Sequence, residues 1–300
     1  MQRVWLYCWD AKGLFGRRAE EAMSVNKFRE EVAAGQRFEF GKNWESFLGK
    51  LNDERISISQ SSLSDMLEVT SLSGRSFLDV GSGSGLSSLA ARNLGANVTS
   101  FDFDESSVWC TSELKNRYYP TDESWAVMQG SALDNNFLCQ LGRFDVVYSW
   151  GVLHHTGKMW AAIDNCLNLV NDDGKFFIAI YNDQGVKSHF WWIVKWLYNK
   201  LPRFLRKPFA YTAGSFVQFL MLLKYTVMLR PMVILGPIFD YKQSRGMSML
   251  SDIVDWYGGF PYEFSTYEYL VDYIESKGFK LQKGKEASSL GCHELVFKRI

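Results

Sequence analysis

The sequence predicts an α/β fold in which helices cover both faces of a parallel sheet. From Gly74 onward, short runs of β-branched and aromatic residues alternate with helical stretches, which is typical of a sheet wound with helices. A glycine-rich turn follows the first of these runs, and an acid, Asp102, ends the second. In a doubly wound sheet those two positions lie side by side where the strand order reverses, and such sheets bind ligands there.

Five strands and the helices between them follow from these patterns. We expect strands over 77–80, 97–102, 125–129, 144–149 and 175–181. We expect the intervening helices over 86–94, 105–117, 135–141 and 160–170, with a turn at Asp173–Gly174 before the fifth strand.

After Tyr181 a long insertion follows, with helices expected over 189–200 and 215–229 and a proline-punctuated linker between them. The capping box Ser265 to Glu268 opens a further helix, and strands over 279–282 and 294–298 close the sheet. Residues 1 to about 60 carry no parallel-strand pattern, so we expect helices there. We therefore expect four parts: an N-terminal helical extension or flap (1–60), a ligand-binding core (61–182), an inserted helical cap (183–264) and a C-terminal return to the sheet (265–300).

The charge of the chain is unevenly distributed. Its 33 basic and 33 acidic residues give a net charge of zero, which argues against a nucleic-acid coat protein. Between Gln184 and Arg245, however, ten basic residues stand against one acid, Asp240, so this segment carries +9. The rest of the chain has 23 basic and 32 acidic residues and carries −9. The basic segment is also rich in aromatic residues.

Cysteine usage and hydropathy bear on location. The five cysteines are widely spread, without a Cys-x-x-Cys pair, which is typical of reduced thiols in a cytoplasmic protein. The apolar run at the N-terminus is too short for a signal-peptide core. The longest uncharged run, Pro208 to Leu223, has 16 residues, fewer than the roughly 18–20 that a membrane-spanning helix needs. We expect a cytoplasmic protein, with contact to a membrane surface left open.

The strongest chemical signal is the turn that contains Gly81, Gly83 and Gly85. Alternate glycines let the backbone approach a ligand closely, and the helix that follows offers unsatisfied N–H groups. Asp102 ends the next strand, where a carboxylate accepts hydrogen bonds from both hydroxyls of a ribose. A nucleoside-containing cofactor is therefore expected. The third glycine falls one residue too early for the dinucleotide fingerprint, and Asp79, before the turn, favours a cationic ligand.

With Asp79 followed by Gly-x-Gly-x-Gly, the chain resembles the class I S-adenosylmethionine-dependent methyltransferases, from about residue 38 to the C-terminus. The segment from Tyr148 to His155 is similar to that of the small-molecule branch that includes the quinone-biosynthesis methylases. The resemblance implies a doubly wound, seven-stranded Rossmann-like sheet, with S-adenosylmethionine as methyl donor and S-adenosylhomocysteine as product. It also implies a set of cofactor-binding residues: Asp79, Gly81, Gly83, Gly85, Asp102, Phe103, Ser131, Ala132 and Trp150. For Trp150, packing at the end of the strand is an equal alternative to stacking on the adenine.

Two details of the resemblance concern the neighbours of the cofactor. The family usually has Asp where this chain has Ser131, beside the expected adenine contact. Relatives place a flap over the cofactor where this chain has the aromatic segment 38–44, although core packing of those aromatics is the alternative. The Asx-Pro-Pro-aromatic tetrapeptide of nucleic-acid amino-methylases is absent, which argues against methylation of DNA bases.

Candidates for the general base follow from position and chemistry. His154 and His155 come just after the fourth strand, and imidazole titrates near neutrality. Asp255 and Glu263 lie in a cluster rich in glycine and aromatic residues that we interpret as a wall of the substrate pocket. Each has a structural alternative: the histidines shape the loop, and the acids cap local N–H groups. None of the four histidines has metal-ligand spacing, so we expect no metal site.

The basic aromatic segment has three interpretations. It forms a structural cap on the active site, rests on anionic lipid, or binds single-stranded RNA, of which the cap is favoured. We expect a methyltransferase that modifies a small, apolar, lipid-like or quinol-like acceptor at oxygen or carbon. The alternatives are a nicotinamide-dependent oxidoreductase and a non-catalytic nucleoside-binding scaffold on a lipid surface. The identity of the acceptor lies beyond the sequence.

Overall fold

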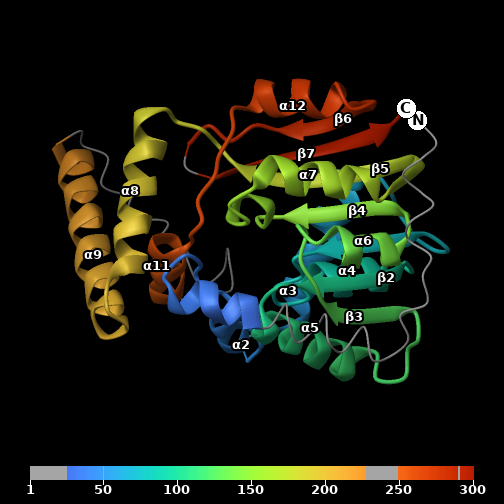
Figure 1. The fold of residues 1–300 in the computed structure, drawn as a ribbon, viewed down its shortest axis with the longest axis horizontal. Helices are drawn as coiled ribbons and strands as arrows, with labels where there is room; N and C mark the ends of the chain where they lie inside the picture. The colour runs from blue at the N-terminus through green and yellow to red at the C-terminus, as the bar shows by residue number, and fades with distance from the viewer. Residues whose placement is uncertain (1–25, 50, 228–248, 290) are drawn as a thin grey trace.

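The computed structural model describes residues 26–49, 51–227, 249–289 and 291–300. Its centre is a seven-stranded sheet with the order β3-β2-β1-β4-β5-β7-β6 (Figure 1). Neighbouring strands are parallel except where β7 pairs, antiparallel, with β5 and β6. The strands are β1 (Ser76–Val80), β2 (Asn97–Asp102), β3 (Trp125–Gln129), β4 (Phe144–Trp150), β5 (Val170–Tyr181), β6 (Phe279–Lys285) and β7 (Cys292–Arg299). The predicted doubly wound α/β sheet is confirmed.

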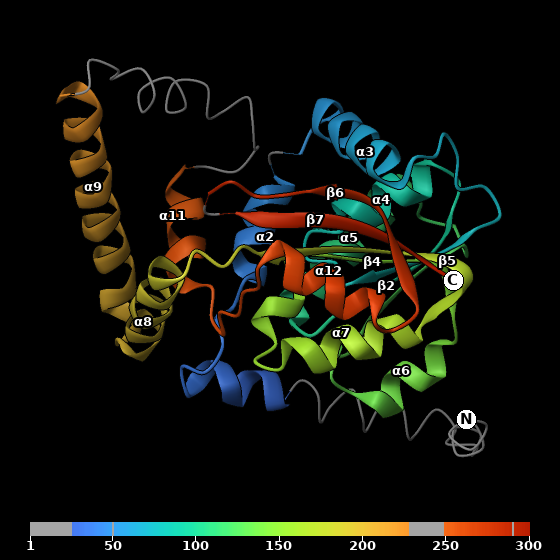
Figure 2. The ribbon, with the colours of Figure 1, turned by 90° about the horizontal axis from the view of Figure 1, so that it is seen from above.

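Helices cover both faces of the sheet, as Figure 2 shows from above. One face packs against α6 (Asn135–Leu141), α7 (Met159–Asn168) and α12 (Tyr267–Glu275). The other packs against α3 (Asp53–Leu67), α4 (Leu86–Asn93) and α5 (Glu105–Tyr118). The two cores arise because successive side chains of a strand point to opposite faces.

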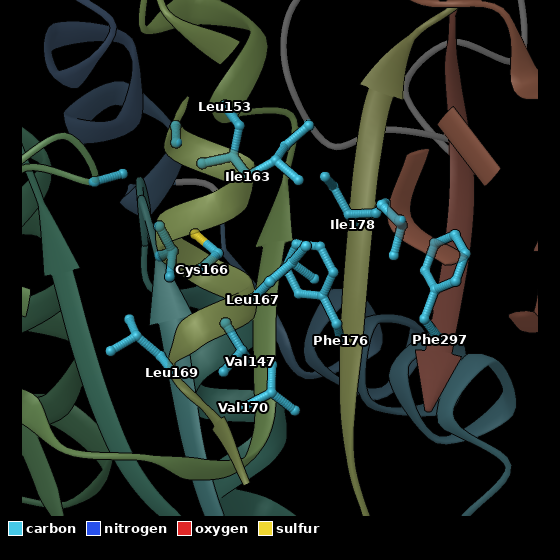
Figure 3. Packing of buried hydrophobic residues seen from close by; sticks show 14 of the residues in the cluster. Val147, Leu153, Ile163, Cys166, Leu167, Leu169, Val170, Phe176, Ile178 and Phe297 are labelled. Atoms are coloured by element: carbon cyan, nitrogen blue, oxygen red, sulfur yellow. The ribbon is translucent and has the colours of Figure 1, made fainter. Parts of the chain in front are cut away.

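The larger core lies between α7 and the middle of the sheet (Figure 3). Phe176 and Ile178 of β5 point into it and are fully buried, whereas Phe177, between them, belongs to the opposite core. Ile163 and Cys166 of α7 meet them from the helix side. Burial of such side chains contributes about 1.5–3 kcal/mol each, so this core holds the carboxyl ends of the strands in place.

A further group of helices lies at one end of the sheet, beside the carboxyl ends of the parallel strands (Figures 1 and 2). These cap helices, a name we keep below, are α8 (Val186–Lys200), α9 (Arg203–Val227) and α11 (Met249–Gly258). They share a small apolar core of their own around Tyr198, Ala210 and Tyr257, to which Phe38 contributes. Two N-terminal helices, residues 26–33 and α2 (Gly41–Leu48), also lie on the sheet's side of the cap helices.

The cap differs from the sequence prediction at a proline. The linker predicted between its first two helices is short, because α9 begins at Arg203 and runs through Pro208. A proline inside a helix leaves the carbonyl four residues earlier without its usual donor. Here that carbonyl belongs to Phe204, a residue that is 77% exposed. Residues 228–229 of the predicted second helix, and the rest of the basic segment up to Arg245, lie outside the described residues.

Other boundaries also differ. Strand β5 begins at Val170 and not at residue 175, so the turn predicted at Asp173–Gly174 lies inside the strand, where its register with β4 shifts. Helix α8 begins at Val186, three residues before the predicted start. Asp255 to Gly258, predicted as loop, are the last residues of α11. The helix predicted to reach residue 170 ends at Asn168, since Val170 already pairs with Phe144 at the start of β5. The N-cap of α12 is the next residue of the capping box, Thr266, whose side chain accepts the N–H of Tyr269. Ser265 cannot take that role because its backbone bridges to the chain after β5.

Helix α3 runs across residue 60, the position at which the sequence predicts the N-terminal extension to end. Ile56 and Leu63, on either side of that position, pack into the same core. Among the residues that the structure describes, there is no helix both long enough and apolar enough to cross a membrane.

The central core sets a prediction for stability. Phe176→Ala should lower the free energy of unfolding by about 3–5 kcal/mol, because it removes a fully buried ring and leaves a cavity. Chemical denaturation followed by tryptophan fluorescence measures this. Ile58→Ala, at a position of α3 that is 56% exposed, is the matched control and should change stability by less than about 0.5 kcal/mol. Equal losses would contradict the assignment of the core.

Candidate active site

A cavity of about 880 Å³ lies at the carboxyl edge of the sheet. The ends of four parallel strands and the start of β7 line it, because strands that run in one direction finish at one edge. These lining positions include Asp79, Asp102, Trp150, Tyr181 and Cys292. The cavity therefore occupies the place at which the sequence predicts ligand binding.

The glycine turn between β1 and α4 forms the floor of this cavity. Gly81, Gly83 and Gly85 all have positive φ angles, of 78°, 54° and 81°. A Cβ atom on Gly81 would come within 2.3 Å of Val152, so both the conformation and the space exclude a side chain. Gly81 and Gly83 line the cavity, whereas Gly85 lies behind it and starts α4.

Asp102 ties the turn to the neighbouring strand. Its Oδ2 accepts the backbone N–H of Gly83 at 2.9 Å, and its Oδ1 accepts that of Asp104 at 2.8 Å. Burial and, to a lesser degree, the nearby Asp104 carboxylate raise the pKa of Asp102 to about 7. Each oxygen retains a lone pair for a ligand, since an ionised carboxylate accepts about four hydrogen bonds.

Asp79 is a second buried acid on the same cavity. Its Oδ2 accepts the hydroxyl of Ser88 at 2.5 Å, and Ser88 in turn contacts Ser100 at 2.7 Å. Burial raises the pKa of Asp79 to about 7, against the lowering effect of Ser88. No cationic side chain of the described residues forms a salt bridge with Asp79. A cationic ligand would supply the charge that this buried carboxyl group requires in its ionised state.

The aromatic segment 38–44 covers the turn from the N-terminal side. The indole of Trp44 lies so close to the glycine turn that a Cβ on Gly83 would be 3.1 Å from its Nε1. Gly41 donates its N–H to Asp104 Oδ2 at 2.8 Å, which fixes the start of α2 against α5. Phe40 and Trp44 both line the cavity.

His155 is the predicted base candidate that reaches the cavity. Its Nδ1 donates to the carbonyl oxygen of Pro261 at 2.6 Å, because that oxygen can only accept. In the neutral ring, Nε2 is then the nitrogen with a free lone pair. Burial, opposed by this hydrogen bond and assisted by Lys195 and Arg37, lowers the pKa of His155 to about 3. The imidazole is neutral at physiological pH.

His154 lies behind His155 and does not line the cavity. Its Nδ1 accepts the N–H of Tyr181 at 3.3 Å, and its ring centroid lies 3.9 Å from that of Tyr181, with the two rings tilted by 37°. Nε2 is buried, with no hydrogen-bond partner among the described residues. Burial holds the pKa of His154 well below its usual value. The geometry favours the structural interpretation of this histidine.

The two acidic candidates lie elsewhere. Both carboxylate oxygens of Glu263 accept the N–H of Met159 at 3.1 Å, so this side chain caps the N-terminus of α7. Burial raises the pKa of Glu263, while the backbone N–H groups of Met159 and Gly157 lower it. Glu263 is not among the residues that line the cavity. Asp255 belongs to α11, but its side chain lies outside the described part of the chain.

The other predicted cofactor residues reach the cavity. Phe103, Ser131, Ala132 and Trp150 all line it. The indole of Trp150 is 47% exposed and donates to Glu294 Oε1 at 3.1 Å, so it is not packed in the core. The Ser131 hydroxyl accepts the N–H of Leu133 at 3.2 Å, which shapes the loop after β3.

Four aromatic rings form a continuous wall of the cavity. Successive ring centroids lie 4.9 Å apart from Phe40 to His155, 5.5 Å from His155 to Tyr181 and 6.0 Å from Tyr181 to Trp256. We call this set the aromatic wall. Behind it, the buried Lys195 donates its ammonium to the carbonyl of Trp256 and lies 4.4 Å from the centre of that indole.

Sequence reasoning missed Arg37, Tyr181 and Lys195. Arg37 donates to Glu31 at 2.7 Å and to the carbonyl of His155 at 2.9 Å, which anchors the N-terminal segment to the site. Tyr181 could have been found, since it ends the fifth strand and therefore lies at the ligand edge. Arg37 and Lys195 belong to no sequence motif, so no pattern distinguishes them. Lys195 also lies among the other basic residues of the segment 184–245. Trp256 belongs to the cluster that was interpreted as pocket wall.

These residues fit S-adenosylmethionine on structural grounds. The buried carboxyl group of Asp79 forms no salt bridge with a cationic side chain of the described residues, and Asp102 can accept further hydrogen bonds. Both acids line the cavity, together with Gly83 and Trp44. S-adenosylmethionine carries a sulfonium and an ammonium group and a ribose with two free hydroxyls. Its charge and hydrogen-bonding groups complement the two acids.

Comparison with known proteins gives a family match over the same part of the chain. Residues 78–176, from β1 to β5, match the family described as a methyltransferase domain. The ubiquinone biosynthesis O-methyltransferase of Coxiella burnetii (strain RSA 493 / Nine Mile phase I) is 27% identical over 175 residues, 55% of this chain and 68% of the relative. That of Actinobacillus pleuropneumoniae serotype 7 is 28% identical over 111 residues, 37% of this chain and 47% of the relative.

Solved structures share the fold. Magnesium protoporphyrin IX methyltransferase from Synechocystis PCC 6803, with bound SAH, matches with a TM-score of 0.50 and 15% identity over 86% of this chain and 94% of that one. PKMT2 from Rickettsia typhi, in complex with AdoHcy, matches with a TM-score of 0.54 and 10% identity over 80% and 52%. The family match over residues 78–176, the sheet order and the cavity chemistry together support a class I S-adenosylmethionine-dependent methyltransferase.

Proposed function

We propose that this methyltransferase transfers a methyl group to a hydroxyl oxygen of a small, apolar, aromatic acceptor. The observation that carries the proposal is the aromatic wall, which lines the same cavity as the predicted cofactor-binding residues. One of its rings, that of His155, has a nitrogen with a free lone pair, Nε2. Planar apolar molecules stack on such rings, and a hydroxyl group on the acceptor would donate to Nε2.

The cofactor end is assigned residue by residue. Asp102 would accept hydrogen bonds from the ribose hydroxyls, and Asp79 would bind a positive charge of the methionine part. The turn at Gly81 and Gly83 would let the backbone approach the ligand closely. Phe103, Ser131, Ala132 and Trp150 would surround the adenine. When bound, the cofactor supplies a methyl group made electrophilic by its sulfonium.

His155 has two tasks in this scheme. Its Nε2 accepts the hydrogen bond of the acceptor hydroxyl and so directs an oxygen lone pair toward the donor. As the oxygen–carbon bond forms, the hydroxyl becomes a very strong acid, and its proton passes to Nε2 even though the pKa of His155 is only about 3. The aromatic wall, with Trp44 above the turn, excludes water from the reacting atoms.

The relatives support the type of acceptor. The curated proteins that match this chain are ubiquinone biosynthesis O-methyltransferases, and this supports oxygen as the atom that is methylated. A quinol-like or lipid-like phenol fits the apolar lining of the cavity.

Cofactor binding tests the assignment of Asp102. Asp102→Ala should weaken binding of S-adenosylhomocysteine by at least about tenfold, because it removes hydrogen bonds from a charged acceptor. Isothermal titration calorimetry measures the affinity. Asp172→Ala, an acid on the exposed side of β5, is the matched control and should bind as the wild type does. NAD should not bind to any of the three proteins, and binding of NAD in place of S-adenosylhomocysteine would support the oxidoreductase alternative.

The raised pKa values of Asp79 and Asp102 predict a pH dependence of binding. Below pH 7 both carboxyl groups are protonated in the free protein, and a cationic ligand must displace those protons. The affinity for S-adenosylmethionine should therefore rise with pH below 7, by up to about tenfold per pH unit for each proton that the ligand displaces, and level off above pH 7. Asp79→Asn should bind more weakly with a flatter profile. A profile that is unchanged by this substitution would contradict the role of Asp79.

Turnover tests His155. With a panel of phenols and catechols as acceptors, His155→Ala should lower kcat about 100-fold or more while leaving the affinity for S-adenosylhomocysteine within about twofold. The wild-type rate should show no loss from histidine protonation between about pH 5 and 8, because the pKa of His155 is about 3. His189→Ala, at an exposed histidine of α8, should turn over normally. An active His155→Ala enzyme would exclude this residue as the base.

A further inference from the structure

Helix α8 presents a line of apolar side chains to solvent on the side opposite its buried face. Val186, Phe190, Ile193 and Leu197 are between 49% and 86% exposed. At 100° per residue these four fall within about 60° of one another around the helix. The side that faces the protein carries the buried Ser188, Lys195, Tyr198 and Asn199. The inward side also carries Trp191 and Val194, which pack on the apolar core of the cap. The outer stripe is therefore apolar surface in addition to the face that α8 buries.

Helix α9 repeats the arrangement. Phe216, Leu220, Leu223 and Val227 follow the same spacing, also fall within about 60°, and are between 46% and 77% exposed. Its buried positions, Ala210 and Gly214, lie on another side and meet α11. Figures 1 and 2 both place α8 and α9 at the end of the molecule farthest from α6. We call these two lines of residues the outer stripes.

The charge around the outer stripes has one sign. From residue 186 to 227 there are seven basic residues and no acidic one. Lys195 is buried, whereas the other basic residues of the two helices are exposed or half-buried: Lys187, Lys200, Arg203, Arg206, Lys207 and Lys224. Around their helices, Lys187, Lys200, Arg206 and Lys224 fall within about 100° of the first residue of an outer stripe, whereas Lys207 lies on the opposite side of α9. Basic side chains that flank exposed apolar residues are typical of a helix that lies in a lipid headgroup region.

From this combination we infer that the outer stripes of α8 and α9 dock on the surface of a membrane that contains anionic lipid. A second copy of the chain fits less well, because a symmetric pairing would bring these basic residues against one another without an acid to compensate them. Exposed apolar residues at i, i+4, i+7 and i+11 enter the acyl region, and the lysines and arginines contact the phosphates. This inference does not depend on which acceptor is methylated.

Vesicle flotation of the full chain tests the inference. The protein should float with vesicles of phosphatidylcholine and phosphatidylglycerol, and bind at least about tenfold more weakly to pure phosphatidylcholine or at high salt. The triple variant Phe190→Ser, Ile193→Ser, Leu197→Ser should lose at least about tenfold in binding. The triple variant Lys187→Gln, Lys200→Gln, Lys224→Gln, which changes exposed basic residues that flank the stripes, should lose about as much, and with it the preference for phosphatidylglycerol.

The control is Ile58→Ser, which changes an exposed apolar residue of α3 and should bind vesicles like the wild type. Thermal melting should be similar in all four proteins, since every changed side chain is exposed. If the serine variant melts much earlier, the glutamine variant still decides the outcome. Failure of the wild-type chain to float, or equal binding by both triple variants and the control, would overturn the inference. A dimer, detected by light scattering, that the serine variant dissociates would assign the stripes to a second copy instead.

Discussion

The turn between β1 and α4 is the constraint on which the rest of the site depends. Gly81 and Ser82 both donate their N–H groups to the carbonyl of Phe101, and Gly83 donates to Asp102. These bonds join the ends of two neighbouring strands and hold the backbone in a left-handed conformation that side chains at Gly81 would prevent. The position of Asp102, the start of α4 and the floor of the cavity all follow from this turn.

Burial controls the charges around the cavity. Burial raises the pKa values of two acids, Asp79 and Asp102, to about 7 and lowers those of His154 and His155, so burial reduces the charge of all four side chains in the free site. Such a site favours a ligand that brings positive charge to the acids and an uncharged, apolar partner to the aromatic wall. The methyl donor and the proposed acceptor would therefore have different electrostatic surroundings within one cavity.

The cap helices serve the site from one side and face solvent with the other. Inward, Lys195 and Asn199 bind the carbonyls of Trp256 and Gly258, which holds α8 against α11 beside the aromatic wall. Outward, the same helix exposes its apolar stripe. The net charge of zero thus combines a cofactor-binding sheet that takes a cationic ligand with a basic cap, and the proposed membrane contact would use the cap alone.

The sequence by itself determined the sheet, the glycine turn and the identity of the acids beside it. These features are local: strand and helix periods, a run of glycines and an acid at a strand end depend on neighbours along the chain, and β2, β3 and α6 occur at the predicted residues. Only the tertiary structure shows that His155 lines the cavity and His154 does not, that Glu263 lies at the N-terminus of α7, and that Lys195 is buried. His154 and His155 are adjacent and have the same side chain, yet their positions relative to the cavity differ. The segments that bury them lie about 100 residues away in the sequence; Pro261, for example, accepts the hydrogen bond of His155. That information is absent from any local pattern.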